Sequence, residues 1–96
     1  MRYISTYIES GRTFHIFEVR GEGQLDGFWG VENTLLDERG CLKQTINGVQ
    51  GHRRDTLAET IASVSTQIKY DKLIAEGYSS LGAMLKIHEE GNRHEL

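Results

Sequence analysis

The chain of 96 residues is long enough for one small domain and too short for two hydrophobic cores. Hydrophobic residues make up 38% of it and charged residues 26%, with a formal net charge of −3, which excludes the disordered and collagen-like classes. The negative balance also excludes the overall basic excess that gives a protein non-specific affinity for nucleic acid. We expect a single domain over residues 1–91 and a flexible tail over residues 92–96.

The sequence carries no membrane or export signal. No window reaches the roughly 18 consecutive apolar residues of a bilayer-spanning helix, and the first residues do not lead into the apolar core of a signal peptide. The single cysteine, Cys41, has no second cysteine with which to form a disulfide within the chain. These features predict a soluble protein of the reducing cytoplasm that does not contact a membrane.

Two alternating segments open the chain. Residues 2–9 and 13–19 show the period of two that is typical of strands, and Ser10 and Gly11 between them predict a two-residue hairpin loop. Uninterrupted alternation in the first segment predicts one face with isoleucines and an opposite face with tyrosines: Ile4, Thr6 and Ile8 against Tyr3, Ser5 and Tyr7.

Two further strands are predicted before the helices. After a glycine-rich loop at residues 21–27, residues 28–33 are typical of a strand, and residues 37–40 have the chemistry of a type I turn. Residues 41–46 then alternate as a fourth strand. The first half of the chain is therefore predicted to be an antiparallel meander.

The second half has the spacing of helices. Thr56 and Glu59 form a capping box, and apolar residues follow it on one helical stripe: Leu57, Ile61, Val64 and Ile68. Gly77 is placed to end this helix, and a second, short helix over residues 79–90 begins at Ser79 or Ser80. We predict an α+β fold, a four-stranded antiparallel β-meander followed by one long and one short helix packed on one face (ββββαα).

The end of the long helix has a second apolar side. Tyr70, Leu73 and Ile74 lie roughly opposite the stripe that should cover the sheet. Either the short helix folds back over them, or they form the face of a homodimer, because an exposed apolar patch usually marks an interaction surface.

One candidate binding surface combines acidic and aromatic residues, which could anchor a partner protein with a basic surface. Its members are Glu22, Asp26, Phe28, Trp29, Glu32, Asp37 and Glu38. The alternative is that Trp29 is a core residue beneath a solvated acidic loop.

A second candidate lies just before the long helix, where glycines, a histidine and arginines could bind an anion or nucleic acid: Gly48, Gly51, His52, Arg53 and Arg54. Aromatic residues on the sheet could supply base stacking: Tyr3, Tyr7, His15 and Phe17. The alternative is that the glycines serve turns and the charged side chains are solvated.

The sequence shows no catalytic set. Cys41 has no neighbouring base, the histidines lack metal-site spacing, and no cofactor loop is found, so we expect no enzyme, metal or cofactor. The leading hypothesis is a cytoplasmic inhibitor or adaptor that binds a protein, and the alternative is a nucleic-acid-binding module. Proteins of this size and build are common among the accessory proteins of phages and mobile elements.

Overall fold

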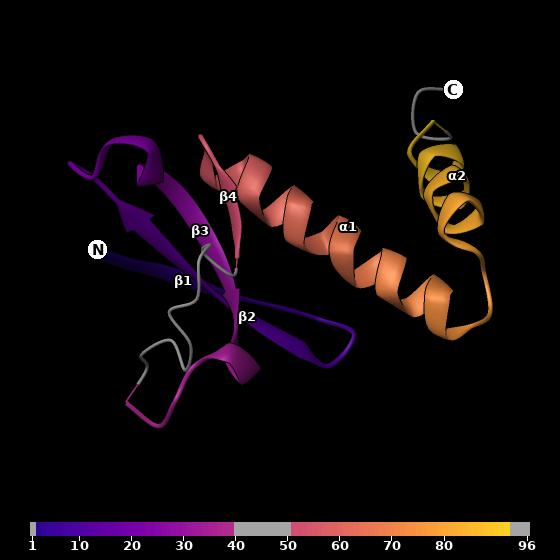
Figure 1. The fold of residues 1–96 in the computed structure, drawn as a ribbon, viewed down its shortest axis with the longest axis horizontal. Coiled ribbons are helices and arrows are strands. Elements are labelled where there is room, and N and C mark those ends of the chain that lie inside the picture. The colour runs from indigo at the N-terminus through magenta and orange to yellow at the C-terminus, as the bar shows by residue number, and fades with distance from the viewer. Residues whose placement is uncertain (1, 40–50, 93–96) are drawn as a thin grey trace. The chain divides into compact units, whose positions relative to one another are not determined.

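The computed structural model describes residues 2–39 and 51–92, with side chains through residue 89. Its elements are strands β1 (Arg2–Glu9), β2 (Arg12–Val19), β3 (Gly27–Glu32) and β4 (His52–Arg54), and helices α1 (Leu57–Ala75) and α2 (Ser80–Asn92) (Figure 1). Short 3-10 turns, η1 (Gly23–Leu25) and η2 (Asn33–Leu35), flank β3.

The strands form one open antiparallel sheet in the order β1-β2-β3-β4. With two helices after it, the sheet confirms the predicted α+β arrangement, ββββαα. The chain divides into two compact units, residues 1–64 with the sheet and the start of α1, and residues 65–96 with the remainder.

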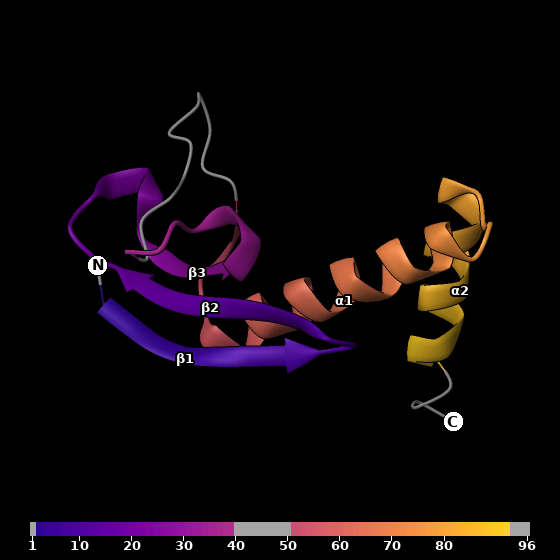
Figure 2. The ribbon, with the colours of Figure 1, turned by 90° about the horizontal axis from the view of Figure 1, so that it is seen from below.

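The β1–β2 hairpin closes as its sequence predicts, and Figure 2 shows the two strands side by side. Ser10 has φ 51° and Gly11 has φ 76°, the left-handed pair of a type I′ turn, whose twist matches that of the strands. Glu9 then pairs with Arg12. The second strand begins one residue earlier than predicted.

A β-bulge at Ile4 changes the faces of β1. Tyr3 pairs with Phe17 and Ser5 with Ile16, so Ile4 is an additional residue with no partner of its own in β2. The prediction that Tyr3 shares a face with Ser5 and Tyr7 is therefore wrong. Alternation read from the sequence assumes uninterrupted pairing, whereas the bulge turns Tyr3 onto the opposite face.

The core of the first unit lies between the sheet and the start of α1. Ile16 of β2 and Val64 of α1 are fully buried, and β3 contributes Gly30 between them. A Cβ at Gly30 would lie 2.6 Å from Val64 Cγ2, so strand and helix approach closely only because this side chain is missing. The Thr60 hydroxyl donates to the Phe28 carbonyl oxygen at 2.9 Å, which joins helix to strand again.

The fourth strand differs from the predicted one. The predicted strand at residues 41–46 lies outside the described residues, and the strand that pairs with β3 is β4, where the sequence predicted a loop. Phe28 pairs with Arg54, Trp29 with Arg53 and Gly30 with His52.

The helix ends follow the predicted signals. The Glu59 amide donates to Thr56 Oγ1 at 3.1 Å, which confirms the start of α1. Gly77 has φ +103°, and the amide of Tyr78 donates to the Leu73 carbonyl at 3.0 Å, completing a Schellman motif. Ser79 caps α2, which continues to Asn92 rather than ending before Gly91, and residues 93–96 of the predicted tail lie outside the described part.

Candidate binding surfaces

The acidic and aromatic residues do not form one surface. Glu22 and Asp26 flank η1 before β3, whereas Asp37 and Glu38 follow η2 after it. A strand of six residues separates these pairs, and such a strand is roughly 17–20 Å long. Phe28 and Trp29 also point to opposite faces of the sheet, because they are consecutive residues of one strand.

Two members of this set are used inside the fold. Trp29 is only 9% exposed, and its indole Nε1 donates to the Leu25 carbonyl at 2.7 Å. Glu32 accepts two hydrogen bonds of 2.8 Å from the Arg12 guanidinium, a bidentate ion pair across β2 and β3. These contacts favour the interpretation of Trp29 as a core residue.

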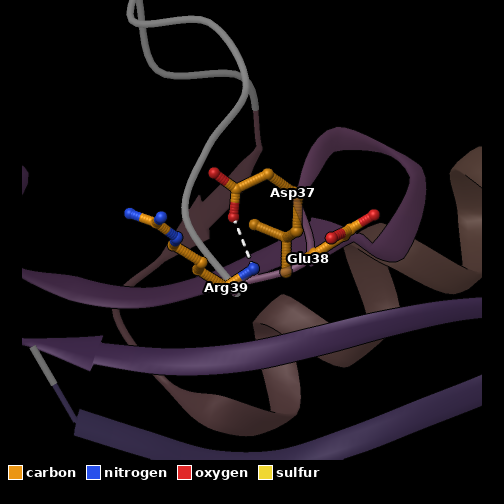
Figure 3. A pocket seen from close by; sticks show the side chains of 4 residues that line it. Asp37, Glu38 and Arg39 are labelled. Atoms are coloured by element: carbon orange, nitrogen blue, oxygen red, sulfur yellow. Dashed lines mark hydrogen bonds between the residues drawn. The ribbon is translucent and has the colours of Figure 1, made fainter.

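A surface hollow of about 460 Å³ lies at the remaining acidic pair and is lined by Leu36, Asp37, Glu38 and Arg39 (Figure 3). The Asp37 carboxylate accepts a hydrogen bond from the Arg39 amide at 2.8 Å, so it closes an Asx turn, while Gly40 of the predicted type I turn lies outside the described residues. All the lining residues come from one stretch of chain, and this carboxylate is engaged with its own backbone.

Of the predicted anion-binding set, Gly48 lies outside the described residues. Most side chains of the described part, residues 51–54, make contacts within the fold. His52 Nδ1 lies 3.1 Å from Ser63 Oγ, and its ring meets the Phe14 ring edge-on at 6.2 Å. Arg53 donates to the Asp26 carbonyl at 2.6 Å and pairs with Asp55 at 2.8 Å. Arg54 is exposed and donates to the Arg53 carbonyl at 2.7 Å.

A surface that the sequence predicted only in part, through Tyr3, His15 and Phe17 of the stacking set, lies on the hairpin, on the face opposite the buried Phe14 and Ile16. We call it the hairpin face, and strand pairing assigns to it Tyr3, Thr6, Ile8, Thr13, His15, Phe17 and Val19. Tyr3 is 55% exposed and Ile8 is 66% exposed. Tyr7 of the predicted stacking set lies on the other face, where it pairs with Phe14.

Hydrogen bonds run across the hairpin face. Tyr3 OH lies 2.6 Å from Thr6 Oγ1, which lies 3.3 Å from His15 Nδ1. His15 Nε2 in turn lies 2.9 Å from Asn33 Oδ1, and the Tyr3 ring packs edge-on against Phe17 at 6.0 Å. The bulge makes this chain of contacts, because it brings Tyr3 to the side of Thr6.

The hydroxyl of Thr6, the imidazole of His15 and the side-chain amide of Asn33 follow one another as the nucleophile, base and orienting group of a catalytic triad do. Catalysis additionally requires donors aimed at the developing charge and a site from which water is excluded. Thr6 is exposed on an open strand face. We therefore interpret the hydrogen bonds as a device that holds the aromatic rings in place.

The charged side chains of the hairpin all lie away from the hairpin face. Arg2 pairs with the buried Glu18 at 3.0 Å, and Glu9 and Arg12 face each other on the same side as Phe14. Antiparallel sheets usually turn their polar residues to water and their apolar residues to the core. In this hairpin the open face is the uncharged one.

A comparison of the chain with known protein families, curated proteins and solved structures found no match. Among the described residues, no three His, Cys, Asp or Glu side chains are grouped so that they could hold a metal ion. Neither described helix combines the length and the apolar character that crossing a membrane requires.

Proposed function

We propose that the chain is a small, non-enzymatic cytoplasmic module that binds a partner protein through the hairpin face. The observation that supports this proposal is an open strand face without charge, on which Tyr3 and Ile8 are more than half exposed. Large exposed apolar patches mark interaction surfaces, and covering this patch would desolvate no charged group of the hairpin.

The hydrogen bonds among Tyr3, Thr6 and His15 support the same proposal. A ring that is already held in place loses less conformational entropy when a partner covers it. Aromatic side chains also anchor many protein interfaces. The matching partner has an uncharged surface at the centre of contact, and the net charge of −3 favours basic residues around it, which speed association.

Ile8→Glu tests the proposal. We expect the immobilised variant to retain no more than about one tenth of the partner that the wild type retains. The reason is that a buried unpaired carboxylate weakens the binding free energy by more than ~1.4 kcal/mol. The partner is captured from a lysate of the native host and quantified by mass spectrometry. Leu25→Glu is the matched control, because Leu25 is an exposed apolar residue outside the hairpin. Proteins retained equally by all three chains would contradict the proposal.

Nucleic acid is the second candidate ligand, and one observation favours it: the rings of Tyr3, His15 and Phe17 gather on one open face. The charge distribution argues against it. No Lys or Arg of β1 or β2 lies on the hairpin face, and phosphate contacts supply most of the affinity of such modules.

Filter binding separates the two candidates. We expect no retention of single-stranded or double-stranded nucleic acid at about 50 mM salt, because the hairpin face has no phosphate-binding cation. Affinity that is present at about 50 mM and falls steeply by about 200 mM would replace the protein-binding proposal with the nucleic-acid one.

A further inference from the structure

Helix α2 has apolar residues on two sides. Ala83 is fully buried and Ile87 is half-buried on one side. On the other side, which we call the outer stripe, Leu81, Met84 and Leu85 are exposed by 67%, 60% and 58%. Their spacing places them together along the helix. A helix that is apolar on both sides is normally covered on both sides.

The beginning of α2 is held by hydrogen bonds that leave the outer stripe exposed. The Schellman motif at Gly77 fixes the end of α1, Ser79 caps α2, and Tyr70 OH lies 2.7 Å from Ser80 Oγ. Of the residues predicted for a dimer face, Tyr70 and Leu73 are half-buried and Ile74 is 39% exposed. Among the described side chains of residues 65–89, the outer stripe is therefore the largest group of exposed aliphatic residues.

The charges of α2 indicate what covers the stripe. The first turn has no acidic residue and the last turn no basic one, while the exposed Glu89 lies near the carboxyl end. This charge is unfavourable for its own helix, because a helix is partially positive at its amino end and negative at its carboxyl end.

A second, antiparallel copy of α2 would supply a favourable charge environment at both ends of the helix. Helix geometry then places Met84 opposite the second copy's Leu85 and Leu81 opposite the second copy's His88. The same alignment brings Glu89 level with the second copy's Ser80 along the helix axis, at the amino end that has no acidic residue. The outer stripe is thus complementary to itself in shape and in charge, as a two-fold interface requires.

We propose that two copies of this chain associate through the outer stripe of α2 in an antiparallel, two-fold arrangement. This proposal does not rest on the hairpin face, which contributes no residue to the helix contact. A dimer would present two hairpin faces, so a partner with repeated sites would be bound with higher avidity than by one copy.

Sedimentation equilibrium over a roughly hundred-fold range of concentration tests the dimer, because mass action makes association depend on concentration. We expect the wild-type mass to rise from that of one chain towards that of two. Leu85→Glu should stay at the mass of one chain throughout, because the two-fold contact would place a carboxylate in its apolar centre. Leu25→Glu is the matched control and should behave as the wild type, since Leu25 is also an exposed apolar residue but lies outside α2 and outside the hairpin face.

Crosslinking tests the orientation in a Cys41→Ser background. An equimolar mixture of Leu81→Cys and His88→Cys chains should form a disulfide between the two variants, because these positions oppose each other only in the antiparallel pair. Three results would overturn the proposal: a wild type with the mass of one chain at every concentration, a Leu85→Glu variant that associates like the wild type, or crosslinking of Leu81→Cys only with itself.

Discussion

Replacing Ile16 by alanine is expected to lower the free energy of unfolding by about 3–4 kcal/mol. Ile16 is fully buried in the centre of the four-stranded sheet, between Phe14 and Glu18 on β2 and opposite Gly30 on β3. Truncation removes apolar contacts and leaves a cavity that the paired strands on either side hold open. For a domain of this size, the loss corresponds to a fall in melting temperature of roughly 12–32 °C.

Ile8→Ala is the matched control. It removes the same atoms from the other strand of the same hairpin, at a side chain that is 66% exposed, and should change stability by less than about 0.5 kcal/mol. Urea denaturation of both variants measures the contrast. Equal losses would show that the hairpin face is covered within the folded chain, and would contradict its assignment as a binding surface.

Gly30→Ala is expected to destabilise the fold by about 1–3 kcal/mol. Within a strand, alanine is ordinarily more stable than glycine by roughly 0.5–1 kcal/mol, so the expected sign is reversed. The reason is the distance of 2.6 Å between the added Cβ and Val64 Cγ2, which is too short for two carbon atoms. Strand β3 and helix α1 must therefore move apart, which changes the geometry of the hydrogen bond from Thr60 to the Phe28 carbonyl.

A double-mutant cycle with Val64→Ala isolates this contact. Alanine at position 64 removes the methyl group that would clash with the new Cβ. The loss of unfolding free energy in the double variant should therefore be smaller than the sum of the two single losses by at least about 1 kcal/mol. Ile61→Ala, on the same helix, is the control partner and should combine additively with Gly30→Ala. Additive losses with Val64→Ala would show that strand and helix do not meet at Gly30.

Local signals in the sequence predicted the first three strands, both helices and their order, but not β4. Ser10 and Gly11 predicted the hairpin loop, Thr56 and Glu59 the start of α1, and Gly77 its end, and each appears where it was expected. These signals are reliable because each depends on the backbone and side chains of a few consecutive residues. The ββββαα arrangement follows from their order along the chain.

The candidate surface depended on contacts between distant residues, which no local pattern shows. A single unpaired residue, Ile4, decides that Tyr3 lies beside Thr6 and His15, since a bulge transfers every residue before it to the other face. Likewise, the partner of β3 is residues 52–54, although this segment carries the glycine and arginine pattern of a loop.

The acidic and aromatic residues show the same limit. They are neighbours in the sequence, but the two acidic pairs lie at opposite ends of strand β3. The two aromatic rings of β3 lie on opposite faces of the sheet. The sequence by itself therefore determined the first three strands, the two helices, the fold class and the surplus of apolar residues near the end of α1. Strand register and the docking of α1 on Gly30 decided which residues form a surface, because these are set by the packing of the whole sheet rather than by any one segment.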